Sequence, residues 1–139
     1  MSTARAAQAA APSLLLAFDF GAKRVGVASG NSITQTATPL ATLATAAGDA
    51  RFAAIGELIA QWQPAALVVG VPRHPDGAAH DNTRRAERFA RQLLGRFGLP
   101  VHQVDERYTT TAALAGGAAD VDAASAALIL EQFFNEHPR

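Results

Sequence analysis

Short apolar segments with a period of two residues occupy the first third of the chain. Residues 14–20, LLLAFDF, place apolar side chains on both faces of an expected strand. Because both faces are apolar, we expect other elements of the fold to cover both of them. A lone carboxylate, Asp19, shares one face with Leu15 and Ala17, so it needs a compensating partner inside the protein.

Two further segments fit an antiparallel meander with the first. Residues 24–29 alternate valines with small residues and follow the first strand after a short connection, which predicts a hairpin. Residues 33–40 alternate threonines with less polar residues and contain Pro39, which a sheet tolerates best at its edge. The pattern therefore predicts three antiparallel strands with the third one outside.

The apolar period then changes from two to three and four residues. This spacing predicts an amphipathic helix over 49–62, and the continuous apolar run 66–71 predicts a parallel strand buried on both faces. The same patterns predict a helix over 83–98, a short strand over 101–105 and a final helix over 122–134. Together these elements predict an α/β fold with a mixed five-stranded sheet, a three-strand antiparallel meander plus two parallel strands, flanked by helices.

The segment before the second predicted helix and the helix itself are candidates for ligand contact. Residues 72–82, PRHPDGAAHDN, predict a surface loop beyond the carboxyl end of a strand, where α/β sheets usually bind ligands. The helix after it turns a row of arginines outward. That row is either a solvated face partly paired with Glu87 or a strip that contacts phosphates. Its members are Arg84, Arg85, Arg88 and Arg91.

Composition narrows the function classes. A chain of 139 residues with 49% hydrophobic content fits one domain, which we expect at 13–139 after a disordered alanine-rich tail at 1–12. The formal net charge is zero, so any site for a polyanion must be local. There is no cysteine, and no segment has the length and hydropathy of a signal peptide or membrane span. We therefore expect a cytoplasmic protein that does not contact membranes.

Acidic residues at three separate places suggest a metal site. Asp19 either accepts hydrogen bonds from the turn, pairs with Lys23 or Arg24, binds a metal ion, or belongs to a phosphate-handling turn like that of actin-like ATPases. Asp105 and Glu106 end a strand and point to opposite faces, so only one of them can face the Asp19 side, and a helix-capping role is as plausible. Asp122 begins the apolar stripe of the last helix, where it either favours the helix dipole or supplies a further ligand for Mg²⁺ or Mn²⁺.

Four motifs in order make the chain similar to the YqgF family, and the match covers nearly everything after residue 12. They are DFGAKRVGVASG at 19–30, the G-V-P and D-G pair within 69–77, DERYTTTAA at 105–113 and VDAASAALILEQFF at 121–134. The family comprises Holliday-junction-resolvase-like proteins, also described as nucleases that process the 5′ end of pre-16S ribosomal RNA. The resemblance implies a ribonuclease-H-like fold and a nuclease that depends on Mg²⁺ or Mn²⁺.

The resemblance also implies roles for particular positions. By matching position, Asp19, Glu106 and Asp122 are the catalytic and metal-binding carboxylates. With a single lysine in the chain, phosphate contacts must come mainly from arginines. The residues that we expect to contact nucleic acid are Lys23, Arg24, Arg73, Arg84, Arg88 and Arg107.

The chain departs from its relatives at Arg73-His74-Pro75 and in the lysine-free segment 116–121. We predict a metal-dependent endonuclease whose substrate is pre-rRNA, in ribosomal precursor particles, or branched DNA. A Holliday junction resolvase, a non-catalytic nucleic-acid-binding module and a small ATP-binding protein are the alternatives, although the missing second lobe disfavours the last. The oligomeric state and the number of metal ions stay open.

Overall fold

The computed structural model of the chain describes residues 13–21, 24–44, 48–72, 81–106 and 121–137. The predicted tail at 1–12 and most of the predicted loop at 72–82 lie outside these residues.

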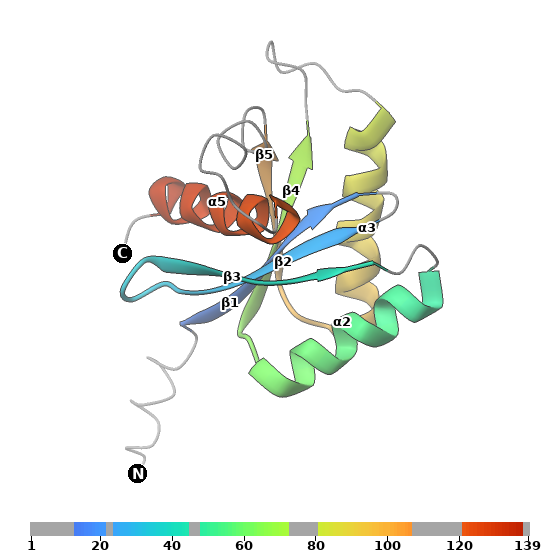
Figure 1. Ribbon diagram of the computed structural model, residues 1–139, viewed down its shortest axis with the longest axis horizontal. Helices are drawn as coiled ribbons and strands as arrows, with labels where there is room; N and C mark the ends of the chain where they lie inside the picture. The colour runs from blue at the N-terminus through green and yellow to red at the C-terminus, as the bar shows by residue number, and fades with distance from the viewer. Residues whose placement is uncertain (1–12, 22–23, 45–47, 73–80, 107–120, 138–139) are drawn as a thin grey trace.

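Five strands form one mixed sheet in the order β3-β2-β1-β4-β5 (Figure 1). Strand β1 pairs antiparallel with β2 and parallel with β4, while β2–β3 is antiparallel and β4–β5 is parallel. This arrangement confirms the predicted fold class, a three-strand antiparallel meander plus two parallel strands. The strands are β1 Leu14–Phe20, β2 Val25–Asn31, β3 Thr36–Leu43, β4 Ala66–Pro72 and β5 Val101–Glu106.

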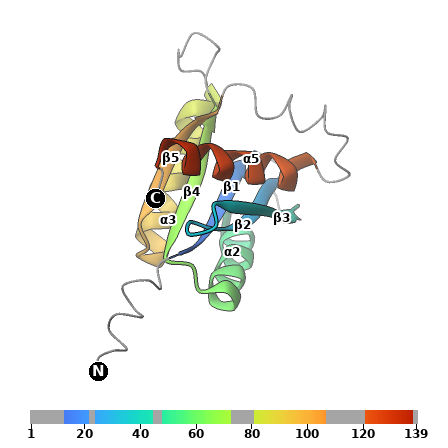
Figure 2. The ribbon, with the colours of Figure 1, turned by 90° about the vertical axis from the view of Figure 1, so that its left-hand side faces the viewer.

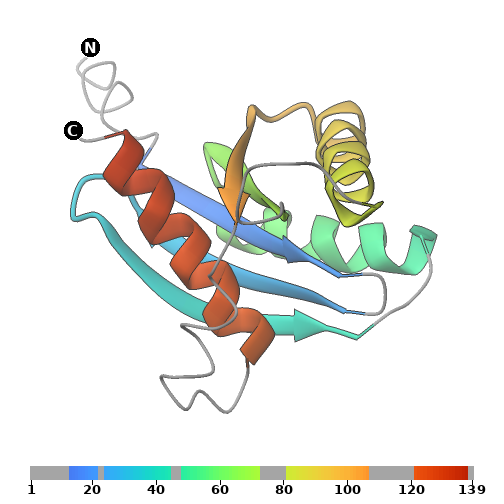
Figure 3. The same cartoon turned by 90° about the horizontal axis from the view of Figure 1, so that it is seen from above.

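Helices cover both faces of the sheet. Helices α2 and α3 lie on one face and α5 lies across the other (Figures 2 and 3). We call these the α2/α3 face and the α5 face. None of the helices in the described part of the chain has the length and apolar character needed to cross a membrane. The helices are α2 Gly48–Trp62, α3 Asp81–Phe97 and α5 Val121–Glu136.

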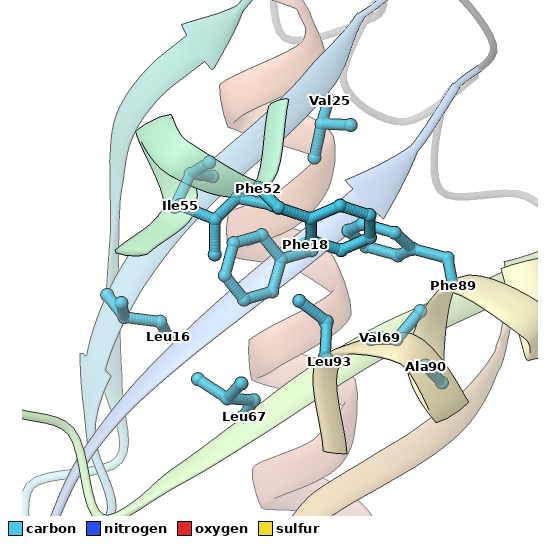
Figure 4. Packing of buried hydrophobic residues seen from close by; sticks show 11 residues of the cluster. Leu16, Phe18, Val25, Phe52, Ile55, Leu67, Val69, Phe89, Ala90 and Leu93 are labelled. Atoms are coloured by element: carbon cyan, nitrogen blue, oxygen red, sulfur yellow. The ribbon is translucent and has the colours of Figure 1, made fainter. Parts of the chain in front are cut away.

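The larger core cluster fills the space between the sheet and the α2/α3 face. Alternate residues of β1 and β4 point into it, as expected for strands that are apolar on both sides. Figure 4 shows the rings of Phe18, Phe52 and Phe89 together at its centre, and the last two are stacked at 5.8 Å between centroids. This packing holds both helices against the carboxyl end of β1.

The core on the α5 face is built partly from small residues. Residues 26, 28 and 30 of β2 are glycine or alanine, and they face Ala126, Ala127 and neighbouring residues of α5. Small side chains on both elements let the helix backbone approach the sheet closely. Leu15 and Ala17 of β1 also belong to the core on this face, so they lie on the opposite side of β1 from Phe18.

The third predicted strand was wrong at both ends, because the structure has it at Thr36–Leu43 instead of 33–40. The side-chain Oδ1 of Asn31 accepts hydrogen bonds from the backbone N–H groups of Ile33 and Thr34, at 2.8 and 3.2 Å. This turn uses the first residues of the predicted strand. The edge position of Pro39 is confirmed, and the other predicted elements agree with the structure to within two residues at each end.

Candidate active site

Asp19 lies near the carboxyl end of β1 and belongs to the α5 face. Its neighbours at the same level are glycines on both sides, Gly26 of β2 and Gly70 of β4. Neither glycine has a side chain that could crowd the carboxylate. Asp19 is half-buried, in a strand whose residues 15–18 are fully buried.

The first turn of α5 rests directly on Gly26. A Cβ atom at that position would lie 1.8 Å from the carbonyl oxygen of Asp122 and 2.9 Å from the amide nitrogen of Ala123. Gly26 is the residue of β2 that pairs with Asp19, so the Asp122 backbone lies over the strand next to Asp19, on the same face of the sheet. The fold therefore places the first turn of α5, which carries Asp122, on the face of the sheet to which Asp19 belongs.

Arg24 orients Asp122 at this site. Its Nε donates a hydrogen bond to Oδ2 of Asp122 at 2.7 Å. The arginine side chain is 62% exposed and the aspartate side chain 29%, so this ion pair adds little to stability. Its effect is to hold one carboxylate oxygen in place at the start of the helix, where negative charge is favourable.

Strand β5 separates the adjacent residues Asp105 and Glu106. Val104 packs in the α5-face core, so Asp105 belongs to the α2/α3 face, away from Asp19. The backbone carbonyl of Asp105 accepts a hydrogen bond from Nε2 of Gln132 in α5 at 2.8 Å. Glu106 pairs in register with Pro72 at the end of β5, and its side chain is outside the described part of the structure.

The predicted nucleic-acid contacts are distributed over both faces. Arg84 and Arg88 are exposed on α3, which covers the opposite face from Asp19. Lys23, Arg73 and Arg107 lie outside the described residues.

Sequence reasoning missed Arg51, which is only 6% exposed in α2. Its guanidinium carbon lies 5.5 Å from the ring centroid of Phe20, and burial lowers its pKa. The signal was present in the sequence, because Arg51 is four residues before Ile55 and therefore shares the buried stripe of the helix.

The donor set at this edge of the sheet suits a hard divalent cation. Asp19 and Asp122 offer carboxylate oxygens, which Mg²⁺ and Mn²⁺ prefer. Among the side chains that the structure describes, no three potential ligands converge. The chemistry of the two aspartates therefore suits such an ion, and a complete ligand set would need further donors.

The chain is similar to known proteins over most of its length. A sequence profile of the RuvX family, described as Holliday junction resolvase, matches residues 13–136. A protein of Polaromonas sp. (strain JS666 / ATCC BAA-500) named "Putative pre-16S rRNA nuclease" is 68% identical over 123 residues, 88% of each chain. One of the same name from Ralstonia pickettii (strain 12J) is 51% identical over 138 residues, 96% of each chain.

Among solved structures, the fold is similar to that of Thermus thermophilus RuvC in complex with a Holliday junction substrate. The TM-score is 0.54 at 17% sequence identity, over 89% of this chain and 94% of that one. A second Thermus thermophilus RuvC structure gives a TM-score of 0.52 at 15% identity, over 88% of this chain and 95% of that one. At this identity the likeness concerns the ribonuclease-H-like fold.

Proposed function

We propose, from the fact that this chain belongs to the RuvX family, that it is an endonuclease that depends on a divalent metal ion. Its proposed cleavage site is near the 5′ end of pre-16S ribosomal RNA. Nuclease activity on a nucleic acid is supported by the family's description and by the names of its relatives. The observation that supports the proposal is the seating of α5 on Gly26, because the backbone of Asp122 then lies over the residue that pairs with Asp19.

Three carboxylates form the proposed centre. Asp19, Asp122 and Glu106 would hold Mg²⁺ or Mn²⁺, which supplies an activated water and offsets negative charge on the scissile phosphate. Asp19 sits on a strand that is paired on both sides, so its backbone is held rigidly. Arg24 keeps Asp122 oriented and brings a positive charge to the site, where it attracts the phosphate.

We propose Glu106, and not Asp105, as the third carboxylate. Asp105 belongs to the α2/α3 face, opposite to Asp19. Position 106 has the same parity as Val104 in β5 and is paired with Pro72 at the carboxyl end of the parallel strands. Lys23 and Arg107, next to Arg24 and Glu106 in the sequence, are proposed as further phosphate contacts.

The biological setting follows the names of the relatives. We propose that the span 13–139 acts as one nuclease domain, in the cytoplasm, on ribosomal precursor particles. A Holliday junction is the second candidate substrate, favoured by the family's description and by the fold shared with RuvC. Both substrates present the same phosphodiester bond, so the proposed centre serves either one.

Cleavage of paired substrates tests the proposal. A pre-16S 5′ leader fragment and a four-way DNA junction are incubated with Mg²⁺ or Mn²⁺, and with EDTA, beside the variant Asp19→Asn. Asp49→Asn is the matched control, because Asp49 is an exposed aspartate in the first turn of α2. We expect metal-dependent cleavage of the leader that Asp19→Asn abolishes and Asp49→Asn retains.

Other outcomes have distinct meanings. Cleavage of the junction alone would select the second candidate substrate. Cleavage that survives Asp19→Asn, or that EDTA leaves unchanged, would contradict the metal-centre proposal. Binding of either substrate without cleavage under every condition would indicate a non-catalytic nucleic-acid-binding module.

A further inference from the structure

A basic pocket of about 300 Å³ lies on the α2/α3 face, on the other side of the sheet from Asp19. It is formed by the end of β1, the start of α2 and the first half of α3, and Phe20, the residue after Asp19, lines it. Three arginines, Arg51, Arg85 and Arg88, line it as well. None of these arginines belongs to the proposed carboxylate centre.

The pocket concentrates positive charge in a chain whose formal net charge is zero. Among the described residues that line it, none is acidic. Gly48, the first residue of the 15-residue helix α2, also lines it, so the positive end of that helix dipole adds to the field. A Cβ atom at Gly48 would meet no atom within 4 Å, so the pocket is open at this point.

Arg51 forms the buried side of the pocket. It is 6% exposed, and its guanidinium lies over the Phe20 ring with 5.5 Å between the guanidinium carbon and the ring centroid. Burial lowers the pKa of Arg51, which reflects the free-energy cost of holding this charge away from water. A negatively charged ligand in the pocket would offset that cost.

The lining of the pocket favours an anionic group over a nucleobase. Phe52 and Phe89 are 6% and 2% exposed, and their rings are stacked on each other at 5.8 Å between centroids (Figure 4). Since core packing already occupies these rings, they offer no platform for a nucleobase. Arg85 and Arg88 lie three residues apart on one helix and are both exposed, so they can approach a phosphate from the solvent side.

We propose that this pocket binds a phosphate group, and that the group is a backbone phosphate of the nucleic acid away from the scissile bond. Assigning the phosphate to nucleic acid rests on the proposed function, whereas the pocket's preference for phosphate does not. Asp19 and Phe20 are consecutive and point to opposite faces of β1. A nucleic-acid strand bound both at the Asp19 centre and in the pocket would therefore cross the carboxyl end of β1.

Binding of the leader RNA in EDTA, at several salt concentrations, tests the nucleic-acid assignment without any need for cleavage. We expect Arg88→Gln to weaken binding and to reduce the slope of log K against log salt by about 0.7 to 0.9, as for one lost phosphate contact. Arg91→Gln is the matched control, because Arg91 is an exposed arginine of the same helix that is absent from the described lining. We expect the slope of the control to equal that of the wild type.

Titration with inorganic phosphate tests the pocket itself. The melting temperature of the wild type should rise and saturate with phosphate relative to chloride at equal ionic strength. Arg51→Met, which retains much of the buried volume, should lose this rise in melting temperature. Arg88→Gln should lose it too, and it provides the test if Arg51→Met does not fold. Arg91→Gln should keep it.

The outcomes separate the two parts of the proposal from the nuclease assignment. If Arg51→Met and Arg88→Gln lose the rise in melting temperature with phosphate, but Arg88→Gln binds RNA with the same salt dependence as the wild type, the nucleic-acid assignment is overturned in favour of a free phosphate compound. No phosphate effect, together with equal slopes for Arg88→Gln and Arg91→Gln, would overturn the pocket. Absence of cleavage with the expected slopes would leave the pocket supported and count only against the nuclease.

Discussion

Replacing Gly26 with alanine should damage the proposed centre without touching any ionisable group. The added Cβ would lie 1.8 Å from the carbonyl oxygen of Asp122, whereas ordinary van der Waals contacts begin at 3.4 Å. The first turn of α5 must therefore retreat by about 1.6 Å, because the opposing atoms are backbone and cannot rotate away. Asp122 moves with this turn, away from Asp19.

This displacement of the first turn of α5 should lower both the stability of the protein and its rate of cleavage. Overpacking of a well-packed contact typically costs about 1 to 3 kcal/mol of the free energy of unfolding. A misplacement of about 1 Å at a catalytic centre can lower the rate by about 100-fold. We expect Gly26→Ala to fold, to melt at a lower temperature and to cleave the leader RNA at least about 100-fold more slowly than the wild type.

Two other glycines provide matched controls. A Cβ at Gly30 would lie 2.4 Å from Cδ2 of Leu130 and 2.7 Å from the carbonyl oxygen of Thr36, so Gly30→Ala also strains the contact of β2 with α5. It does so about two helical turns from Asp122. Gly95 in α3 has no atom within 4 Å of its Cβ position, so Gly95→Ala should stabilise the protein by about 0.4 to 1 kcal/mol.

The assay combines thermal unfolding with single-turnover cleavage at a temperature where all variants are folded. Gly30→Ala should lose stability while it keeps most of its activity, and Gly26→Ala should lose more activity than its loss of stability explains. Wild-type activity and stability in Gly26→Ala would refute the close approach of α5. Equal losses of activity in Gly26→Ala and Gly30→Ala would refute the specific role of this turn in placing Asp122.

Three further predictions concern an ion pair, a histidine and the core. Arg24→Gln should slow cleavage at least about tenfold. It should change the free energy of unfolding by at most about 1 kcal/mol, because the arginine side chain of the pair with Asp122 is largely exposed. A loss of stability as large as the loss of activity would indicate that Arg24 has a structural role. Burial, and secondly repulsion from His137, lower the pKa of His102, so the unfolded chain binds the proton more readily and stability should fall as the pH drops below about 6.5. His102→Gln should therefore show a smaller loss of melting temperature than the wild type between about pH 7.5 and about pH 5.5, and an unchanged loss would contradict this sign. Leu67→Ala, at a fully buried position of the larger core, should cost about 2 to 5 kcal/mol in chemical denaturation, and a cost under about 1 kcal/mol would show that this core is loosely packed.

The pattern of apolar residues determined the elements, their order and the faces they bury. Alternation in 14–20 correctly separated Leu15 and Ala17 from Phe18, because the side-chain period of a strand depends only on local backbone geometry. The edge position of Pro39 followed from its missing N–H group. The start of β3 escaped prediction because a hydrogen-bonded turn at Asn31 competed with the strand pattern.

Only the tertiary structure decided how the candidate site is assembled. The sequence left Arg24 open as a partner of Asp19, whereas the structure pairs it with Asp122, 98 residues further along the chain. The seat of α5 on Gly26 and the separation of Asp105 from the Asp19 face depend on sheet register and helix packing. These are contacts between distant segments, and no local period encodes them. The motifs could therefore suggest candidate carboxylates, while the packing of α5 on β2 determined that Asp122 lies on the Asp19 face of the sheet.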